Sequence, residues 1–580
     1  MSISLILNRY QIYYMKTLFS LLLTMVLVSC NQSGNLKYAT VEGPGVIARN
    51  GMVVSASSEA SGIGVEIMKA GGNAFDAAVA TGFALAVSYP GAGNIGGGGF
   101  MVMRTADGKT DAIDYREKAP LKASRDMYLD SAGQVMTGVS TTTHLASGVP
   151  GSVDGMIEVH RKYGSLPFKK VIQPAIDLAE NGFYISSDMA ESLNECRKIF
   201  LESNRKPTAF VKDSAWKEGD ILKQPELAAT LRLIRDKGRD GFYSGRTAEL
   251  ISDEMSRGSG LIGKKDLEEY RSVWRSPLAG TYRGYRLITM SPPSSGGTTL
   301  MQLLWMIESH DIGKLGFLSP ESVHLMAEAE RRAFADRAYF MGDPDFVKIP
   351  LEKLLDKQYI KERMSSFRPD RATLSSEIGH GIIEGYSSEE TTHYSVVDRF
   401  GNAVSATTTL NGGYGNFVVV EGAGFLLNNE MDDFSIKPGF PNMFGLVGGE
   451  ANSIKPGKRM LSSMTPTIIE KEGQLYMVVG SPGGSTIPTS VFQVIVNTID
   501  FGMTIQQAVD SGRFHHQWLP DYISIEGSAF DSISVMKLEK LGHKLRKRGA
   551  IGRVNAIMKL PDGSLQGGAD KRGNNSAAGY

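Results

Sequence analysis

Residues 391 to 411 constrain the fold of this chain more than any other stretch, because their pattern is that of a β-hairpin. Its two arms are rich in Val, Thr and Tyr, which suit pleated strands. The Asp-Arg-Phe-Gly-Asn sequence between the arms forms turns readily, with Gly401 available for a positive φ. A three-residue loop or a five-residue loop would each pair Val397 with Ala403. The sequence therefore predicts two antiparallel strands in one fixed register.

This register gathers hydroxyl groups at the open end of the hairpin. Counting back from the turn sets Thr391 opposite Thr409. Side chains of a strand alternate between its two faces, so every second residue shares the face of these two. The residues of that face are Thr391, His393 and Ser395 on the first strand and Thr407, Thr409 and Asn411 on the second.

Thr391 is a candidate nucleophile only if a base can take its proton, and no Ser-His-Asp set can be identified around it. Cleavage between Glu390 and Thr391 would supply one, because the freed α-amino group, with a pKa of about 8, would lie beside its own hydroxyl. Residues 375 to 390 are polar and rich in Gly and Ser, as in an exposed loop. The hairpin alone also fits an ordinary polar loop that leads into an ordinary Thr-rich strand.

Several motifs in fixed order resemble the γ-glutamyltranspeptidase family of N-terminal nucleophile hydrolases. The resemblance runs from about residue 40 to Tyr580, and it implies an α+β fold, the four-layer αββα sandwich, built from two autoproteolytic fragments of one precursor. The motifs that carry it are TTHYSVVD from residue 391, LLNNEMDDF from 426, LSSMTPT from 461, GSPGGS from 480 and RFHHQW from 513.

The resemblance implies that Thr391 is the nucleophile and that Thr409 orients it. We assign Gly483 and Gly484 as the oxyanion hole, because consecutive glycines before a helix can direct backbone N–H groups at one point. Phosphate binding is the competing use of such a loop, but no P-loop lysine follows.

A γ-glutamyl substrate carries an ammonium group beside its α-carboxylate, so its site needs acceptors for the first and donors for the second. A guanidinium can hold a carboxylate through two hydrogen bonds, although a single arginine is more often a solvated surface charge. The other candidates could equally be turn residues. The contacts implied by the resemblance are Asp433, Glu430 and Asn411 to the ammonium group and Arg116, Ser462 and Ser463 to the carboxylate.

The loop from 438 to 449 resembles the lid of the family. Phe444 stands where many bacterial relatives have tyrosine, and the missing hydroxyl predicts looser gating. The adjacent His515 and His516 would face opposite ways on an extended segment, so we interpret them as core histidines. No metal or other cofactor is predicted.

The glycine-rich run from Gly91 to Phe100 contains the dinucleotide pattern GxGxxG, but a predicted helix precedes it and a predicted strand follows it. Dinucleotide binding needs the reverse order, so we interpret the run as close backbone packing near the active site. The preceding helix, Asn73 to Ser88, is apolar on nearly every face and should be buried between layers.

The N-terminus resembles that of a secreted lipoprotein. Met15 would start translation, an apolar run follows, and Leu-Val-Ser-Cys ending at Cys30 resembles a bacterial lipobox. A simple membrane anchor or a signal cut elsewhere is the alternative. The predicted parts are a signal peptide (1–30), a large subunit (31–390) and a small subunit (391–580). They predict a periplasmic protein of the bacterial cell envelope that contacts the membrane only through the lipid on Cys30.

The formal charges cancel, with 62 Lys plus Arg against 62 Asp plus Glu, so nothing favours nucleic acid as a partner. The predicted function is transfer of the γ-glutamyl group of glutathione and related amides to water, amino acids or peptides, by a heterodimer of the two subunits. One alternative is a cephalosporin or glutaryl acylase on the same scaffold. The other is an unprocessed, non-catalytic lipoprotein.

Overall fold

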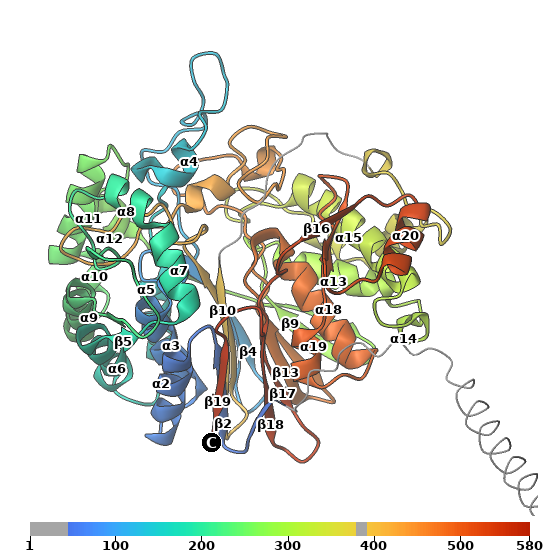
Figure 1. The fold of residues 1–580 in the computed structure, drawn as a ribbon, viewed down its shortest axis with the longest axis horizontal. Coiled ribbons are helices and arrows are strands. Elements are labelled where there is room, and N and C mark those ends of the chain that lie inside the picture. The colour runs from blue at the N-terminus through green and yellow to red at the C-terminus, as the bar shows by residue number, and fades with distance from the viewer. Residues whose placement is uncertain (1–44, 379–390) are drawn as a thin grey trace, which may run out of the picture. The chain divides into compact units, whose positions relative to one another are not determined.

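A computed structural model of the chain describes residues 45–378 and 391–580. Two seven-stranded sheets face each other, and helices cover the outer face of each sheet (Figure 1). All neighbouring strands within these two sheets are antiparallel. The predicted four-layer αββα sandwich is confirmed.

The two sheets are each built from strands on both sides of residue 390. The first sheet contains, in order, β1 (Val46–Ala48), β18 (Leu565–Ala569), β17 (Asn555–Lys559), β13 (Gln474–Gly480), β12 (Thr467–Lys471), β9 (Tyr285–Thr289) and β8 (Leu278–Tyr282). The second contains β19 (Ser576–Gly579), β2 (Gly51–Ser55), β10 (Thr392–Asp398), β11 (Ala403–Thr409), β3 (Gly98–Arg104), β4 (Thr110–Asp114) and β7 (Val273–Arg275). The segments before and after residue 390 therefore share one core.

Helices of the two outer layers pack on separate hydrophobic clusters. The second sheet is covered by α2 (Ser58–Lys69), α3 (Ala74–Ser88), α5 (Ser152–Tyr163), α6 (Phe168–Asn181), α9 (Pro225–Lys237), α10 (Asp240–Tyr243) and α11 (Gly245–Arg257). The first is covered by α13 (Gly296–Ile307), α15 (Pro320–Phe340), α18 (Ile487–Ile499) and α19 (Ile505–Asp510). A third cluster fills the space between the sheets.

Shorter elements decorate this sandwich. They include α4 (Val139–Thr142), α7 (Ser187–Glu195), α8 (Arg197–Ser203), α12 (Lys264–Glu269), α14 (Ile312–Leu315), α16 (Leu351–Leu354), α17 (Lys357–Met364) and α20 (Ser532–Lys540). Two small sheets pair β5 (Phe183–Tyr184) with β6 (Ile221–Leu222), and β14 (Phe514–His515) and β16 (Leu545–Arg548) with β15 (Ile523–Glu526).

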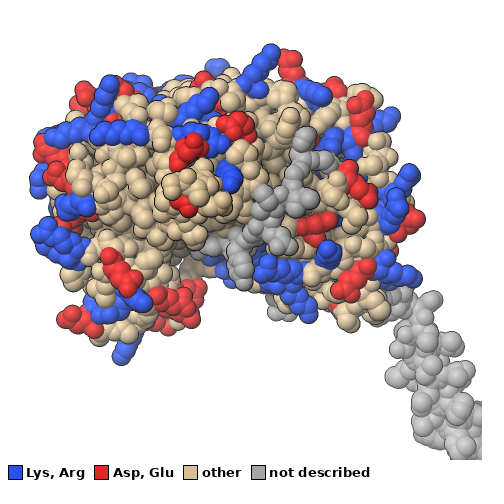
Figure 2. Space-filling view, turned by 90° about the horizontal axis from the view of Figure 1, so that it is seen from above, with Lys and Arg blue, Asp and Glu red and all other residues tan. Residues whose placement is uncertain are grey.

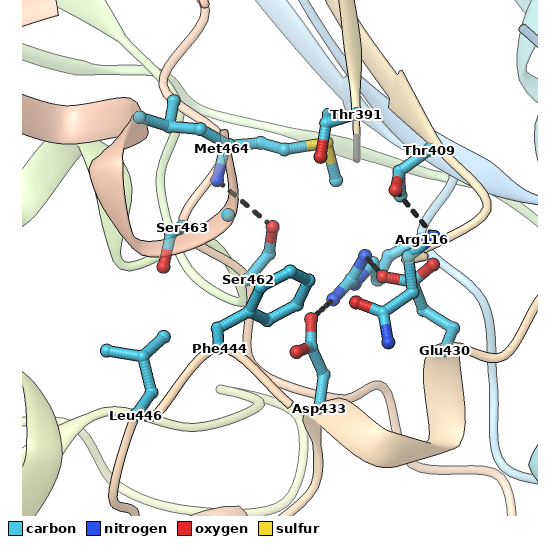
Figure 3. A pocket seen from close by; sticks show the side chains of 13 residues that line it. Arg116, Thr391, Thr409, Glu430, Asp433, Phe444, Leu446, Ser462, Ser463 and Met464 are labelled. Atoms are coloured by element: carbon cyan, nitrogen blue, oxygen red, sulfur yellow. Dashed lines mark hydrogen bonds and ion pairs between the residues drawn. The ribbon is translucent and has the colours of Figure 1, made fainter. Parts of the chain in front are cut away.

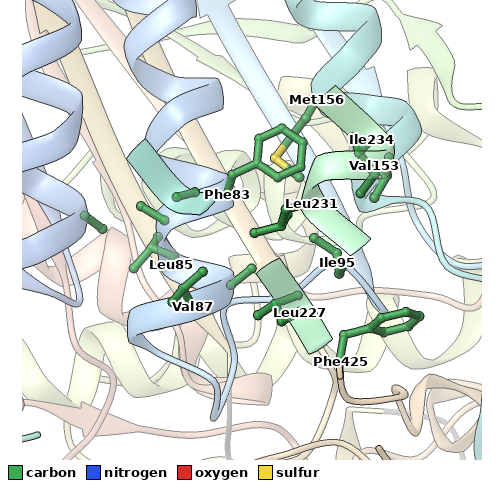
Figure 4. Close-up of a cluster of buried hydrophobic side chains, with 14 of the residues drawn as sticks. Phe83, Leu85, Val87, Ile95, Val153, Met156, Leu227, Leu231, Ile234 and Phe425 are labelled. Atoms are coloured by element: carbon green, nitrogen blue, oxygen red, sulfur yellow. The ribbon is translucent and has the colours of Figure 1, made fainter. Parts of the chain in front are cut away.

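The helix predicted from Asn73 is α3, and every one of its residues is buried. Asn73 caps it through a capping box with Asp76, which satisfies backbone N–H groups that a buried helix start cannot give to water. Phe83, Leu85 and Val87 of this helix meet side chains of α5 and α9 (Figure 4). Ser57 caps the neighbouring helix α2.

The hairpin has the predicted register, with Val397 opposite Ala403 and Thr392 opposite Thr408. Gly401 in the turn has a φ of 88°, as its role required. The hairpin lies in the middle of the second sheet, where β2 pairs with β10 and β3 pairs with β11. Its strands cannot shift without disturbing both neighbours.

Glycines 97 to 99 lie against this hairpin, as close packing predicted. A Cβ on Gly97 would stand 2.0 Å from the carbonyl oxygen of Thr409, and one on Gly99 would stand 2.3 Å from that of Thr407. Real Cβ atoms do not approach an oxygen so closely, so side chains here would push the hairpin away. The order of helix α3 before and strand β3 after is not that of a dinucleotide fold.

Charged side chains of both signs are interspersed on the face shown in Figure 2, in keeping with the balanced composition. Within residues 45–378 and 391–580, no helix combines the length and the apolar character that crossing a membrane requires.

We expect Gly97→Ala to destabilise the protein, because its methyl group would collide with the Thr409 carbonyl and overpacking costs about 1–3 kcal/mol. Gly62→Ala is the matched control: Gly62 lies within α2 and a Cβ there would meet no atom within 4 Å. It should stabilise by about 0.5–1 kcal/mol. Thermal unfolding of both variants checks this. Equal unfolding midpoints for the two variants would show that close packing does not require glycine in this run.

Candidate active site

One pocket brings together the open end of the hairpin and segments far away in sequence (Figure 3). The pocket is narrow and partly open to solvent, and Thr391, which directly precedes β10, is only 4% exposed within it. The pocket is lined by Arg116, Thr391, Thr409, Asn411, Glu430, Asp433, Phe444, Leu446, Ser462, Ser463, Met464, Gly484 and Ile487.

Nearly all the residues singled out in the sequence meet here. Every predicted substrate-binding residue, the lid residue Phe444 and the predicted catalytic residues except Gly483 line the pocket, and Gly483 directly precedes Gly484. Glu390 and Cys30 lie outside the described residues. The apolar members Leu446, Met464 and Ile487 were missed, since nothing local in the sequence distinguishes them from core residues.

Arg116 forms the buried end of the pocket, only 1% exposed. It lies two residues beyond the end of β4, whose last residue, Asp114, accepts a hydrogen bond from the Arg116 N–H at 3.0 Å through its carboxylate. The Arg116 guanidinium donates to Glu430 and to Asp433, and its Nη1 lies 3.7 Å from Glu117. The arginine assigned to the carboxylate of the ligand and the acids assigned to its ammonium group are thus bonded to each other.

Burial and charge act against each other in this cluster. Burial lowers the pKa of Arg116, but Glu430, Asp433 and Glu117 outweigh it and raise that pKa above its usual value. Burial raises the pKa of Glu430 well above its usual range and that of Asp433 to a lesser degree, with Arg116 opposing both. Burial also raises the pKa of Glu117 to about 7. Three carboxyl groups therefore surround the Arg116 guanidinium, and Arg337 acts on Asp433 from the other side.

Backbone and side-chain donors fix the polar groups that surround the hairpin end. Thr409 Oγ1 accepts from the N–H of Asn411 at 2.7 Å, which requires Asn411 to adopt a φ of 75°. The Asn411 side chain donates to the carbonyl of Asn429 at 3.0 Å. Ser462 Oγ accepts from the N–H of Met464 at 3.1 Å, as Figure 3 shows.

His393 lies on the hairpin face of Thr391 but does not act as a base. It is fully buried, and burial lowers its pKa to about 3, so it is neutral. Its ring shares hydrogen bonds with Thr407 Oγ1 at 2.9 Å and Ser395 Oγ at 3.1 Å. A Cβ on Gly480 would stand 2.3 Å from this ring, so the histidine packs the hairpin against β13 of the other sheet.

The glycine loop after β13 adopts backbone conformations that favour glycine. Gly483 has a φ of 131° and Gly484 a φ of 51°, and α18 begins at Ile487. A Cβ on Gly484 would stand 2.5 Å from the ring of Phe444. The lid residue therefore lies directly on the glycine loop.

The lid is held mainly by apolar packing and by Asn442. Phe444 is buried in a cluster with Phe334 and Trp518. Asn442 Oδ1 accepts from the N–H groups of Phe444 at 3.0 Å and Leu446 at 3.1 Å, while its Nδ2 donates to Asp433 at 2.9 Å. The lid is thus coupled to the charged end of the pocket. Looser gating through the absent hydroxyl stays a prediction.

Helix α15 supplies a residue that the sequence analysis missed. Arg337 donates to Ser463 Oγ at 3.0 Å and to Ser295 Oγ at 2.9 Å. Burial lowers the pKa of Arg337 to about 10, against the pull of Asp433, so the group stays cationic at neutral pH. Arg337 is one of several charged residues of α15, so nothing local in the sequence distinguished it.

The histidines are structural, as predicted. His515 and His516 are buried, and burial lowers the pKa of each, to about 3 and about 4. Among the described residues, His324, Glu328 and His543 bring potential metal-ligand atoms within 4.8 Å of one another. The Glu328 carboxylate already accepts from Arg332 at 2.7 Å and Thr373 Oγ1 at 2.6 Å, which accounts for the cluster without an ion.

Comparisons with known proteins identify the family of the chain. A family model described as gamma-glutamyltranspeptidase matches residues 60–580. A glutathione hydrolase proenzyme of Escherichia coli strain K12 is 48% identical over 538 residues, which cover 92% of this chain and 93% of that protein. The crystal structure of a cephalosporin acylase from Bacillus halodurans matches 95% of this chain and 99% of its own, with a TM-score of 0.81 at 27% identity.

A crystal structure of Helicobacter pylori gamma-glutamyltranspeptidase gives a partial match. The matching chain is 48% identical with a TM-score of 0.55, and the match covers 57% of this chain but 96% of that one.

We expect Glu330→Gln to stabilise the protein increasingly as the pH rises. Glu330 in α15 is fully buried and accepts one hydrogen bond, from the N–H of His516 at 2.7 Å; burial raises its pKa well above the usual value. The folded state therefore holds this proton more tightly than the unfolded chain, and stability falls as the pH rises above the unfolded pKa of about 4.3. Glutamine keeps the acceptor and removes the titration.

Thermal unfolding at pH 5 and pH 8 measures this effect. The midpoint of Glu330→Gln should exceed that of the wild type by at least about 1 °C at pH 8, and by less at pH 5. Glu328→Gln is the control from the same helix: Arg331 and Arg332 lower the pKa of Glu328 against its burial, so its loss should destabilise at pH 8. If the unfolding midpoint of Glu330→Gln exceeds that of the wild type by the same amount at both pH values, the raised pKa of Glu330 is contradicted.

Proposed function

The chain belongs to the gamma-glutamyltranspeptidase family, and on this premise we propose that it is a glutathione hydrolase and γ-glutamyltransferase that cuts itself before Thr391. The observation that carries the proposal is one pocket holding a buried threonine hydroxyl, an arginine and two acids. A γ-glutamyl group needs all of these: a nucleophile for its γ-carbonyl and partners for its α-carboxylate and ammonium.

Recognition of the donor follows from an exchange of ion pairs. The α-carboxylate of the substrate would bond to Arg116, with Ser462 and Ser463 as further donors. The ammonium group would bond to Asp433 and Glu430, with the Asn411 side chain beside them. Because the substrate brings one charge of each sign, the net charge of the pocket is unchanged and every buried charge keeps a partner.

Maturation would be the first reaction of Thr391. Its Oγ attacks the carbonyl carbon of Glu390, the peptide C–N bond breaks, and the ester that forms is hydrolysed by water. A large subunit ending at Glu390 and a small subunit beginning at Thr391 result. The partial match to the chain of the Helicobacter pylori enzyme, at 57% of this sequence, supports a division near that point.

Turnover would reuse the same hydroxyl with a new base. The free α-amino group of Thr391 takes the Oγ proton as Oγ attacks the γ-carbonyl, and the N–H groups of Gly483 and Gly484 stabilise the oxyanion. Thr409, held by the Asn411 N–H, orients the nucleophile. The amide C–N bond then breaks, and the leaving amine receives the proton. Water or an acceptor amine attacks the γ-glutamyl ester and restores the hydroxyl.

The cellular location rests on the N-terminal motif, within residues that lie outside the described part. We assign residues 1–30 as a signal peptide with translation from Met15, and Cys30 as the lipidated residue. The mature protein would then lie in the cell envelope, on the periplasmic side. Its lipid would attach it to the membrane.

An acylase that takes glutaryl or β-lactam side chains is the second candidate, favoured by the structural match to the cephalosporin acylase. A glutaryl group has no ammonium group, so an enzyme for it has no use for a buried acid pair. Asp433 and Glu430 at the inner end of this pocket favour the γ-glutamyl donor.

Thr391→Ala tests the mechanism. It should migrate as a single band near the precursor mass and release 4-nitroaniline from γ-glutamyl-4-nitroanilide at least about a thousand-fold more slowly. Thr391→Ser keeps a hydroxyl and is the control that should still be cut. In the wild type, sequencing should find a second N-terminus that begins Thr-Thr-His-Tyr. If the alanine variant still gives two bands and still releases 4-nitroaniline at the wild-type rate, the mechanism is refuted. A wild-type protein that remains one uncut chain would instead favour a lipoprotein that only binds its ligand.

Asp433→Asn separates the two enzyme candidates. The substitution keeps the shape of the side chain but removes the charge that would hold the ammonium group. We expect kcat/KM for a γ-glutamyl anilide to fall at least about 30-fold, because an unpaired buried charge costs 2–5 kcal/mol. Turnover of the matched glutaryl anilide should not fall with it. If the wild type prefers the glutaryl substrate, the acylase function is the correct one.

A further inference from the structure

Helix α20 turns large apolar side chains toward solvent. The helix lies on the outside of the molecule, beside α15 (Figure 1). Its inner face packs on the cluster of that layer through Leu538, which is fully buried, and Val535. Ile533 and Met536 nevertheless point away from the cluster, with 59% and 60% of their surface exposed. A single exposed apolar residue is ordinary, but two that are one turn apart form a patch that folding leaves uncovered.

Lysines share the outer face of this helix. At 3.6 residues per turn, residues spaced i, i+3, i+4 and i+7 lie on one face. The members of that face are Ile533, Met536, Lys537 and Lys540, and both lysines are exposed. Glu539 lies at the flank of this face rather than on it. The solvent side of α20 therefore combines apolar side chains with positive charge.

The same surface continues past the C-terminal end of α20. Lys544 follows the helix and is exposed. The carbonyl of Leu541 accepts from the N–H of Ala372 at 2.6 Å, which brings Leu374, 53% exposed, to this end of the helix. We call the following set the α20 surface: Leu374, Ile533, Met536, Lys537, Lys540 and Lys544.

The α20 surface is basic in a chain whose charges balance overall. Residues 531 to 549 contain six Lys or Arg against two acids, Asp531 and Glu539, an excess of four positive charges. Asp531 is the N-cap of α20, where it accepts from the N–H of Ser534 at 2.6 Å. Within residues 45–378 and 391–580, the three lysines of the α20 surface form no ion pair. Their ammonium groups are thus available to an anionic partner.

We propose that the α20 surface docks on a lipid bilayer that contains anionic lipids. Its lysines would meet the phosphates of the headgroups, and the apolar side chains between them would enter the boundary with the acyl chains, as in interfacial amphipathic helices. A soluble polyanion would use the lysines but would leave Ile533 and Met536 exposed. The proposal goes beyond the proposed function and does not depend on the reaction.

The proposed lipid on Cys30 makes a bilayer the anionic partner within reach. The 14 residues from 31 to 44 connect Cys30 to the described part of the chain, and a segment of that length spans at most about 50 Å. A protein held so close to a membrane meets its surface at a high effective concentration, so weak docking is sufficient. The α20 surface would add a second contact to that of the lipid.

Co-sedimentation with vesicles tests the proposal on residues 31–580, which contain every described helix and strand and carry no lipid. More protein should bind to vesicles of equal parts phosphatidylglycerol and phosphatidylcholine than to phosphatidylcholine alone. Lys537→Gln with Lys540→Gln should weaken binding to the anionic vesicles about 30-fold, since each lysine near such a surface contributes about fivefold. Ile533→Ser with Met536→Ser should weaken it at least about tenfold, through lost apolar contact.

Lys223→Gln with Lys237→Gln is the matched control. It removes two charges from exposed lysines near the two ends of α9, which lies in the outer layer of the other sheet. This variant should bind like the wild type, and all three variants should keep the wild-type unfolding midpoint, which shows that they fold.

The proposal is overturned if the wild type binds both kinds of vesicle equally or binds neither. It is also overturned if loss of the apolar pair leaves binding unchanged, because the surface would then suit a soluble polyanion instead. Sedimentation measures no turnover, so failure of the proposed function would be seen separately, as a wild type that binds vesicles but does not cleave a γ-glutamyl anilide.

Discussion

The position of Thr391 depends on the register of a hairpin in the middle of a sheet. β10 and β11 pair with each other and also with β2 and β3, so each strand is fixed on both sides. A slip of one residue would turn every side chain of the hairpin to the other face and take the Thr391 hydroxyl out of the pocket. The glycines at 97 to 99 permit this arrangement, because they let a second backbone pass within contact distance of the strand end.

The charges at the inner end of the pocket explain why so specific a ligand is expected there. Arg116 is buried among Glu117, Glu430 and Asp433, an arrangement that is costly to assemble because burial opposes the charge of every member. A zwitterion satisfies such a site better than a simple anion or cation, since it provides a partner for both signs at once. The Asn442 side chain links Asp433 to the lid, so a ligand bound at the charged end of the pocket can affect the lid at its entrance.

The sequence predicted those parts of the site that local patterns determine. Alternation predicted the register of the hairpin, continuous apolarity predicted the burial of α3, and adjacent glycines predicted the loop at 483 and 484. The residue roles themselves came from a family resemblance. Contacts across long separations could not be read from any local pattern. The bonding of Arg116 to Asp433 and that of Arg337 to Ser463 both arise from how distant segments pack.

The sharing of both sheets by the segments before and after residue 390 has a consequence for the lifetime of the mature enzyme. Scission removes one covalent bond but no strand pairing, so the two pieces remain interlocked by the same core. Once unfolded, however, they would diffuse apart, and recovery would become a bimolecular encounter that no longer benefits from the tether. The uncut chain could refold by itself, whereas the cut protein could not readily do so. The lifetime of the folded heterodimer would thus be set by its rate of unfolding.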